Sequence, residues 1–431
     1  MIRLDEAKRV HMVGIGGIGM SALAQYLADQ GVRVSGSDRS HSPVTELLAE
    51  KGIDTTYEQE KGIVPEDTDL LIYTEAVWED NLERVRATEL GIPQRSYFDA
   101  LGDISKAKRT IAIAGTHGKT TTTGMLARVL KDAGLSPTAI VGSLVRDFGS
   151  NYLAGNSDWF VVEACEYKRD FLTLSPEILV ITNIEFDHSD YYKDLADVQS
   201  AFRSMALKVP AGGCIITNPS DPNIAPVLEG LSVLVIDYTK ETRYPTRFPG
   251  EFNVMNARAA SAVARYVMPN LSEEALRDSL AEFKGTWRRF EYKGKTARGA
   301  DVYDDYAHHP TAVEKTMTAL REKVGSTKIF VAFHPHLFSR TRDLLPGFAT
   351  AFKEADTLLI APIYGAREVD DGSMSSEILA DSIRKNGVDA SAASFKEIQA
   401  FLETEPSAGD VVMIMGAGDI YTIADQLVES S

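Results

Sequence analysis

The chain has 431 residues, of which 44% are hydrophobic and 25% are charged. This length predicts about two to four domains, and this composition excludes a mainly disordered or collagen-like protein. Its 45 basic and 62 acidic residues give a formal net charge of -17, which argues against a general nucleic-acid-binding protein.

The sequence also indicates a compartment. No run of about 18 apolar residues is present, so we expect no membrane-spanning helix and no membrane partner. Residues 1–6 lack the apolar core of a secretory signal. The two cysteines, Cys165 and Cys214, match neither a disulfide framework nor a zinc-site spacing, and we expect both to be packing residues. These features predict a cytoplasmic protein.

Apolar strand-like runs alternate with amphipathic helical patterns from one end of the chain to the other. This alternation predicts an α/β fold with mostly parallel sheets. The expected strand-then-helix pairs are residues 10–14 and 18–30, 109–114 and 119–131, 301–305 and 312–323, 328–333 and 341–354, and 411–415 and 419–428, with a further strand at 32–36.

Two short polar segments, residues 102–109 and 292–299, each come directly before an expected strand. They predict three domains, at about residues 1–106, 107–296 and 297–431. We expect both segments to act as hinges between these domains.

The first glycine-rich turn is Gly14-Ile15-Gly16-Gly17-Ile18-Gly19, which follows an expected strand and opens an expected helix. Asp38 closes the next strand, at the distance at which an acid contacts a ribose hydroxyl in dinucleotide-binding folds. The free N–H groups and the dipole of a helix N-terminus favour an anion. The turn therefore predicts a diphosphate site, which suits a dinucleotide and a nucleotide-sugar equally well.

The second turn is Gly115-Thr116-His117-Gly118-Lys119-Thr120-Thr121, between the expected strand 109–114 and a helix. It is a shortened form of the P-loop pattern. Backbone amides would cradle phosphates, Lys119 would reach the β- and γ-phosphates, and the Thr120 hydroxyl would ligate Mg²⁺. This turn predicts an ATP site.

The third turn, Gly416-Ala417-Gly418-Asp419, follows the expected strand 411–415. A helix N-cap explains it fully, and we rank that interpretation above a ligand site.

Two anion-binding turns in one chain restrict the possible functions. An NAD-dependent oxidoreductase explains only the first turn, and a plain ATPase explains only the second. A non-catalytic nucleotide-binding module leaves Lys119, Glu163 and His188 without a purpose. A ligase that joins a nucleotide-linked acid to another molecule at the expense of ATP explains both turns.

The sequence resembles the Mur ligase family along essentially its whole length, in three α/β domains: Rossmann-like, central P-loop ATPase-like with a mixed or parallel sheet, and C-terminal Rossmann-like. The family segments are residues 115–121, 163–167, 182–188, 253–260, 288–291 and 304–310. Residues 14–20, 115–120, 334–341 and 415–421 are most similar to the members that use L-alanine.

The resemblance implies an ATP- and Mg²⁺-dependent ligation in peptidoglycan precursor synthesis. The lactyl carboxylate of UDP-N-acetylmuramate would attack the γ-phosphate of ATP to form an acyl phosphate, and the amine of L-alanine would displace phosphate from it. The alternative within the family is a ligase that attaches a recycled tripeptide to the same nucleotide. The implied partners are these small molecules, with no nucleic acid, in a monomer or homodimer.

The resemblance also implies roles for particular residues. Thr120, Glu163 and His188 would hold Mg²⁺, and Glu166 is a less certain candidate. Lys119, Glu163, His188 and Arg289 would be catalytic, whereas Arg288 is expected to be a solvated neighbour. Contacts to ATP are implied for Gly115, Thr116, His117, Gly118, Lys119, Thr120, Thr121, Asn253, Asn256, Arg289, Asp304 and Asp305.

The remaining implied contacts lie at the two ends of the chain. The UDP-sugar would contact Gly16, Gly17, Ile18, Gly19, Ser37, Asp38, Thr74 and His117. The amino acid would contact Tyr306, His308, His336 and Arg340, with His336 orienting Arg340. The sequence departs from the family at Phe252, where a His is frequent, and at Leu337, where many relatives carry a further Arg.

Overall fold

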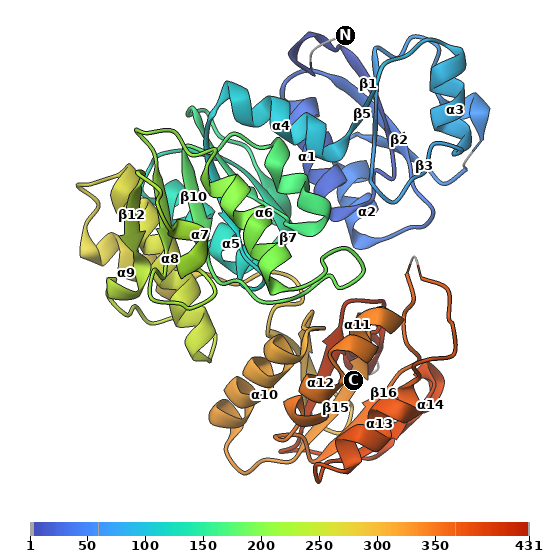
Figure 1. Ribbon diagram of the computed structural model, residues 1–431. Helices are drawn as coiled ribbons and strands as arrows, with labels where there is room; N and C mark the ends of the chain where they lie inside the picture. The colour runs from blue at the N-terminus through green and yellow to red at the C-terminus, as the bar shows by residue number, and fades with distance from the viewer. Residues whose placement is uncertain (1–3, 59, 367, 430–431) are drawn as a thin grey trace. The chain divides into compact units, whose positions relative to one another are not determined.

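The computed structural model describes residues 4–58, 60–366 and 368–429, whose strands form three sheets (Figure 1). The described chain divides into two compact units. The first unit holds residues up to Ile184 together with Val198–Pro245 and Asn256–Lys284, and it contains two of the sheets. The second unit holds Glu185–Asp197, Thr246–Met255 and the residues from Gly285 onward, with the third sheet.

The first sheet is fully parallel and has the strand order β3-β2-β1-β4-β5. The order reverses between β1 and β4, which is where ligands bind in doubly wound sheets. The first glycine-rich turn follows β1, at this point. The elements are η1 (Leu4–Glu6), β1 (Arg9–Val13), α1 (Ile18–Asp29), β2 (Arg33–Ser37), α2 (Pro43–Glu50), β3 (Asp54–Thr56), η2 (Lys61–Ile63), β4 (Leu70–Tyr73), α3 (Leu82–Glu89), β5 (Gln94–Ser96) and α4 (Tyr97–Ala107).

The second sheet has the order β12-β11-β10-β6-β9-β7-β8, and every pair is parallel except β7 with β8. Its central strands are buried along almost their whole length, as expected where helices cover both faces. The elements are β6 (Arg109–Ala114), α5 (Lys119–Asp132), β7 (Thr138–Val145), β8 (Ser150–Leu153), β9 (Trp159–Glu163), η3 (Tyr167–Thr173), β10 (Ile178–Ile181), α6 (Leu195–Ala206), β11 (Cys214–Thr217), α7 (Ala225–Leu228), β12 (Leu234–Asp237), η4 (Tyr238–Lys240), α8 (Glu251–Val267) and α9 (Glu273–Glu282).

The third sheet has the order β13-β14-β18-β15-β16-β17, with only β13 antiparallel to its neighbour. One core packs α10, α12 and α13 against it, and a second core packs α14 and α15. The elements are β13 (Glu291–Lys295), β14 (Asp301–Asp305), α10 (Pro310–Val324), β15 (Ile329–His334), α11 (Phe338–Asp343), α12 (Leu345–Ala351), β16 (Thr357–Ile360), α13 (Ser376–Arg384), β17 (Asp389–Ala392), α14 (Phe395–Thr404), β18 (Val411–Gly416) and α15 (Tyr421–Glu429).

The α/β fold with parallel and mixed sheets is therefore confirmed. In the described part of the chain, no helix is long and apolar enough to cross a membrane.

The hinge predicted at residues 102–109 is wrong. Helix α4 continues through Ala107 and β6 begins at Arg109, so a single residue separates them. The Thr110 hydroxyl donates to the Ser105 carbonyl at 3.0 Å, which ties the strand to the helix. Both elements lie inside the first compact unit.

The first two sheets are joined further by a buried polar network between α1 and β8. The Gln25 side chain donates to the Asn151 carbonyl oxygen at 2.9 Å and accepts from the Ser150 hydroxyl at 2.8 Å. The Asn151 amide in turn donates to the Ser21 hydroxyl at 2.8 Å and to the Ile18 carbonyl. A buried amide that loses its hydrogen-bond partner destabilises the fold. This network therefore holds the first turn of α1 against the second sheet.

Two further expectations need correction. Residues 292–299 are not a hinge, because β13 pairs with β14 in the third sheet, so the domain boundary expected at residue 296 is too late. The helix expected over 341–354 is two helices, α11 and α12, which separate at Leu344. Pro346 sits at the start of α12, where its missing N–H costs no hydrogen bond.

Candidate active site

The P-loop turn joins β6 to α5 in the first unit. Gly118, the N-cap of α5, has a φ of 83°, which a residue with a side chain adopts at a cost. A Cβ at this position would lie 2.4 Å from Oδ1 of Asn256, so the space also requires glycine. The turn leaves the amides at the start of α5 without a side-chain cap, as an anion-binding helix end requires.

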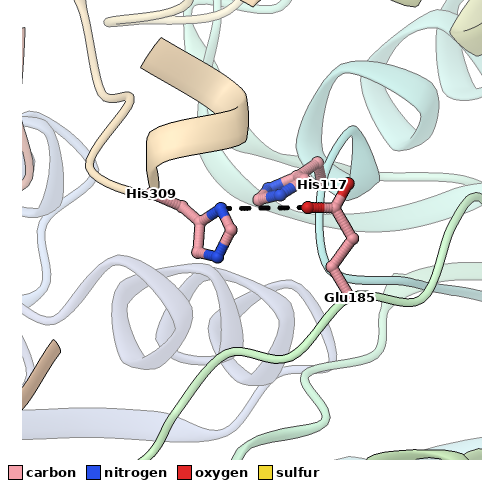
Figure 2. A group of neighbouring side chains, drawn as sticks. All are labelled: His117, Glu185 and His309. Atoms are coloured by element: carbon pink, nitrogen blue, oxygen red, sulfur yellow. Dashed lines mark ion pairs between the residues drawn. The ribbon is translucent and has the colours of Figure 1, made fainter. Parts of the chain in front are cut away.

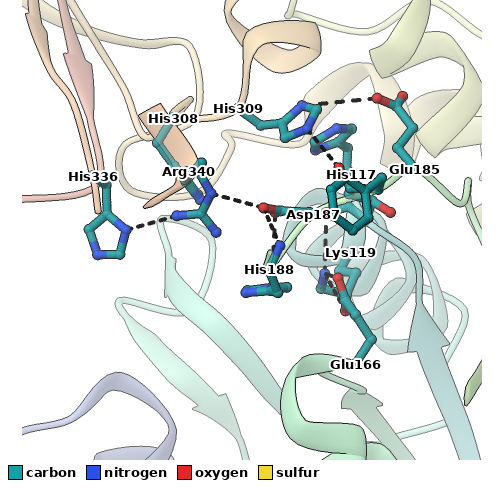
Figure 3. Close-up of polar contacts among 12 residues, drawn as sticks. His117, Lys119, Glu166, Glu185, Asp187, His188, His308, His309, His336 and Arg340 are labelled. Carbon is teal, nitrogen blue, oxygen red and sulfur yellow. Dashed lines mark hydrogen bonds and ion pairs between the residues drawn. The ribbon is translucent and has the colours of Figure 1, made fainter. Parts of the chain in front are cut away.

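Lys119 lies at the start of α5 with its ammonium group buried (Figure 3). The ammonium donates to the Gly115 carbonyl, to the Thr116 carbonyl at 3.3 Å and to the Glu166 carboxylate at 2.9 Å. Burial is the largest single effect and lowers the pKa of Lys119, but Glu166 and the neighbouring acidic groups together outweigh it, and the pKa is raised above its ordinary value. Lys119 is therefore a permanent cation, and Glu166, an uncertain metal ligand from sequence, is its counterion.

Two of the predicted Mg²⁺ ligands lie side by side in the same unit. The Thr120 hydroxyl donates to Oε1 of Glu163 at 3.0 Å, and Oε2 of Glu163 accepts from the Gly142 amide at 2.9 Å. A hydroxyl and a carboxylate are oxygen donors of the kind that Mg²⁺ prefers. The residues present thus fit the metal that the sequence predicts.

Asn256 borders the same turn from α8. Its Oδ1 accepts from the Thr122 hydroxyl at 3.3 Å. Its buried Nδ2 has no hydrogen-bond partner among the described residues. Buried polar groups are rarely left unpaired, so this amide is suited to donate to a ligand such as adenine. Asn253 belongs to the second unit and donates to the Pro249 carbonyl at 2.8 Å.

The end of β2 forms hydrogen bonds with the first glycine-rich turn. The amides of Gly14 and Ile15 both donate to the Ser37 carbonyl at 2.9 Å. The Ser37 side chain points into the core, where its hydroxyl donates to the buried Glu83 carboxylate at 2.6 Å. Glu83 also contacts the buried His11 imidazole at 2.8 Å. Ser37 thus stabilises the turn from the core side.

The other feature of this turn is the uncapped start of α1. Gly17, the N-cap of α1, has no side chain to cap the helix that Ile18 begins. The Gly16 amide donates to the Asp38 carboxylate at 2.8 Å, so Asp38 lies directly at the predicted diphosphate site. The side chain of Thr74 packs against Gly14, where a Cβ would lie 2.5 Å from its methyl group.

The segment after Glu166 is strained. Lys168 and Arg169 have φ values of 52° and 63°, which non-glycine residues adopt at a cost of about 1 kcal/mol or more each. Burial and the nearby Glu75 carboxylate raise the pKa of the next residue, Asp170, to about 7. Residues with such conformations and shifted pKa values are frequent in functional sites.

Asp170 makes the stability of the fold depend on pH. Its folded pKa lies above the unfolded value of about 3.9, so between about pH 4 and pH 7 only the folded chain holds this proton. Its stabilising contribution is complete below about pH 4 and is lost as the pH rises through about 7. Between about pH 4 and pH 7, the thermal unfolding midpoint of Asp170→Asn should therefore fall less with rising pH than that of the unchanged chain. A pH dependence identical to that of the unchanged chain would contradict the assignment.

In the second unit, Arg340 is the centre of a buried polar chain (Figure 3). Its Nε donates to the Asp187 carboxylate at 2.8 Å, and its Nη1 lies 2.9 Å from Nδ1 of His336. Although burial raises the pKa of Asp187, Arg340 and the neighbouring histidines together hold it well below its usual range. The predicted contact between His336 and Arg340 is therefore present. Asp187 was missed, although it lies within the family segment 182–188.

His308 and Tyr306 lie next to this chain. Nδ1 of His308 is 2.9 Å from the Tyr306 carbonyl. Burial first, and then the Arg340 charge, lower the pKa of His308 well below its usual range, so its ring is neutral. The ring contacts that of His336 edge-on, with centroids 5.7 Å apart. The four predicted amino-acid-binding residues are thus brought together.

His188, the third predicted Mg²⁺ ligand, follows Asp187 and has a φ of 56°. Its amide donates to Oδ1 of Asp187 at 2.7 Å, and its Nε2 lies 3.9 Å from Oδ2. Close by in the same unit, Glu185 and Nδ1 of His309 form an ion pair at 3.9 Å (Figure 2).

Arg288 is not a solvated side chain. Its guanidinium is buried, lies 3.1 Å from the Asp304 carboxylate and donates to the carbonyls of Gly416 and Gly418. Arg288 thus holds the third glycine-rich turn in place. This structural role explains the conformation of the turn, and no ligand is needed. Burial raises the pKa of Asp304 to about 7, although Arg288 opposes the shift.

The residues on either side of Arg289 are fixed by buried hydrogen bonds. Asp305 is buried and accepts from the amides of Phe290 and Ala307, each at 2.7 Å. Asp304 and Asp305 thus both face the interior. Arg289 itself is half-buried, and its guanidinium lies 5.0 Å from the centre of the Tyr306 ring.

Comparison with known proteins decides the family. The Mur ligase family catalytic domain matches residues 9–109, the Mur ligase middle domain matches 113–244, and the Mur ligase glutamate ligase domain matches 288–418. The chain belongs to the Mur ligase family. It is therefore an enzyme, an ATP-dependent ligase, and the resemblance read from the sequence is confirmed. The C-terminal match begins at residue 288, just before β13.

Individual Mur ligases cover the whole chain. The UDP-N-acetylmuramate–L-alanine ligase of Clostridium novyi is 40% identical over 99% of this chain and 98% of its own length. The enzyme of the same name from Clostridium kluyveri is 38% identical over 97% of both. The crystal structure of UDP-N-acetylmuramate-alanine ligase from Thermotoga maritima has a TM-score of 0.81 at 30% identity, over 98% of both chains. A murein peptide ligase from Psychrobacter arcticus, 24% identical with a TM-score of 0.74, shares the fold.

Proposed function

We propose that this Mur ligase joins L-alanine to the lactyl carboxylate of UDP-N-acetylmuramate at the expense of ATP, as a step of peptidoglycan precursor synthesis. The main support is the identity of about 40% over the full length of the L-alanine ligase of Clostridium novyi. The two phosphate-binding turns, at Gly16 and at Gly118, match a reaction that uses two nucleotides. Because both substrates are intracellular nucleotides, we place the enzyme in the cytoplasm.

The first step transfers the γ-phosphoryl group. An oxygen of the lactyl carboxylate attacks the γ-phosphorus, the bond to the β-phosphate oxygen breaks, and ADP leaves. Both reacting groups are anions, so cations must converge on them. Lys119 and Arg289 supply positive charge, and the Asn256 amide orients the adenine. Thr120 and Glu163 would hold Mg²⁺, with His188 as the further ligand that the family resemblance implies, and the ion would supply further charge neutralisation.

The second step forms the amide. The amine of L-alanine attacks the acyl carbon, loses a proton and displaces inorganic phosphate. Arg340 holds the alanine carboxylate with a planar fork of N–H donors. His308 and Tyr306 line the pocket beside it, and the neutral His308 ring adds no charge that would repel the amine.

The decisive experiment measures ATP-dependent phosphate release with UDP-N-acetylmuramate and either L-alanine or the tripeptide of the murein-peptide ligases. Release with L-alanine, together with a product heavier by one alanine residue, supports the proposal. Release with the tripeptide alone shows a recycling ligase instead, and release with neither refutes both functions.

The N-terminal turn is expected to bind a UDP-sugar and not NAD. Calorimetry should detect binding of UDP-N-acetylmuramate and no binding of NAD or NADP. Gly16→Val should abolish the UDP-sugar signal, because a Cβ at residue 16 would lie 2.8 Å from both Asp38 and Thr45. Tight NADH binding that Gly16→Val removes would refute the ligase interpretation of this domain.

A further inference from the structure

Tyr97 lies beside the first glycine-rich turn of the first unit. It is the first residue of α4, directly after the N-cap Ser96. The tip of its ring covers the first turn of α1: a Cβ on Gly19 would lie 2.6 Å from both Cζ and the hydroxyl oxygen of Tyr97. The phenol hydroxyl thus sits directly beside the helix end predicted to bind the diphosphate.

The same ring is close to the P-loop side of the unit. Burial first, and then the charge of Glu163, raise the pKa of the Tyr97 phenol above its ordinary value. Glu163 is the carboxylate that accepts from the Thr120 hydroxyl. A phenol with an ordinary pKa of about 10 is already a hydrogen-bond donor at working pH. Tyr97 thus presents its O–H group beside Gly19, within electrostatic reach of Glu163.

This hydroxyl is available to a ligand. Tyr97 is half-buried, and its hydroxyl takes part in none of the hydrogen bonds found among the described residues. A half-buried phenol usually has a partner for its O–H group. A bound molecule that passes over Gly19 toward Thr120 and Glu163 would supply acceptor oxygens at this place.

We propose that Tyr97 is a substrate-binding residue whose hydroxyl donates a hydrogen bond to the N-acetylmuramyl part of UDP-N-acetylmuramate. This inference rests on the proposed function. The substrate must extend from the diphosphate at the start of α1 to the γ-phosphate at the start of α5. The sugar and its lactyl group lie between these two anionic ends, and their oxygens are hydrogen-bond acceptors. Tyr97 thus recognises the portion of the substrate that distinguishes it from other UDP compounds.

The test compares Tyr97→Phe with the unchanged enzyme by calorimetry, using UDP-N-acetylmuramate and UDP alone as ligands. Removing one neutral hydrogen bond should weaken binding of UDP-N-acetylmuramate by about 3- to 10-fold. Binding of UDP should not change, because UDP lacks the sugar. In steady-state kinetics, KM for UDP-N-acetylmuramate should rise while KM for ATP and for L-alanine remains the same.

Tyr26→Phe is the matched control, since Tyr26 lies near the C-terminal end of α1, the helix whose first turn Tyr97 covers. It removes a phenol hydroxyl from α1 far from the glycine-rich turn, so binding of both ligands should be unchanged. Phenylalanine keeps the ring over Gly19, and an unchanged unfolding midpoint will show that the fold is retained.

Two results would overturn the inference: Tyr97→Phe binding UDP-N-acetylmuramate as tightly as the unchanged enzyme, or losing affinity equally for UDP. If the unchanged enzyme ligates L-alanine in the same experiments, only the role of Tyr97 is refuted. If it fails to bind UDP-N-acetylmuramate at all, the proposed function itself is wrong.

Discussion

Lys119→Ala is expected to abolish ligation while UDP-N-acetylmuramate binding remains largely intact. The ammonium group is the buried cation of the P-loop, and it touches the Gly115 carbonyl that begins the turn. Its loss should remove several kcal/mol of transition-state stabilisation, about a 10²- to 10³-fold or larger fall in rate. The proposed diphosphate site, at Gly16 and Gly19, follows β1 of a different sheet from the one that Lys119 follows.

Phosphate release and calorimetry measure the two quantities separately. Lys131→Ala is the control, since Lys131 is an exposed residue in the last turn of the same helix α5. It should retain full activity. An alanine variant at residue 119 that keeps more than about a tenth of normal activity would contradict the role of this lysine.

Arg340→Lys is expected to raise KM for L-alanine by about 10-fold or more, the effect of losing about 1.4 kcal/mol from a charge-assisted hydrogen bond. A lysine keeps the positive charge beside Asp187 but cannot reproduce the planar fork of donors. It also loses the contact with His336, which now fixes one arm of the guanidinium. KM for ATP should change little, because the ATP contacts are assigned mainly to the P-loop.

Steady-state kinetics with each substrate varied in turn will test this assignment. Arg342→Lys, two residues further along α11, is the matched control. Among the described residues, Arg342 forms ion pairs with the partly exposed acids Asp343 and Asp371 and donates to the Ser373 hydroxyl at 3.2 Å. The control variant should leave all three KM values unchanged. If Arg340→Lys leaves KM for L-alanine unchanged, or raises KM for ATP equally, the amino-acid pocket lies elsewhere.

The fold class followed from the sequence because its evidence is local. Buried parallel strands such as β6 and β18 appear as continuous apolar runs, and amphipathic helices follow them. The segment 102–109 was misread because Asp103, Lys106 and Lys108 suggest a linker. Asp103 and Lys106 lie on the more exposed side of α4, whose other side buries Leu101 and Ile104, and Lys108 is its C-cap. Polar composition alone does not distinguish an amphipathic helix end from a hinge.

The site was predictable only in part, because its pairings join distant residues. The glycine turns and Lys119 stand out by their spacing, but Asp187 and Arg340 are 153 residues apart in the sequence. Nothing local identified Arg288 as buried and Arg289 as the more exposed neighbour, since both are arginines in one short motif. Burial of a charged side chain depends on a partner such as Asp304, which arrives only when the third sheet forms.

The pairing of Lys119 with Glu166 has a consequence for turnover. Without ATP, the Lys119 ammonium group is already paired with the Glu166 carboxylate. A nucleotide phosphate must therefore replace this carboxylate as the partner of Lys119. We expect the same carboxylate to compete for the ammonium group when phosphate departs, so that inorganic phosphate is a weak competitor for Lys119. We expect Glu166→Gln to make inorganic phosphate a stronger product inhibitor, because nothing would then displace it from Lys119.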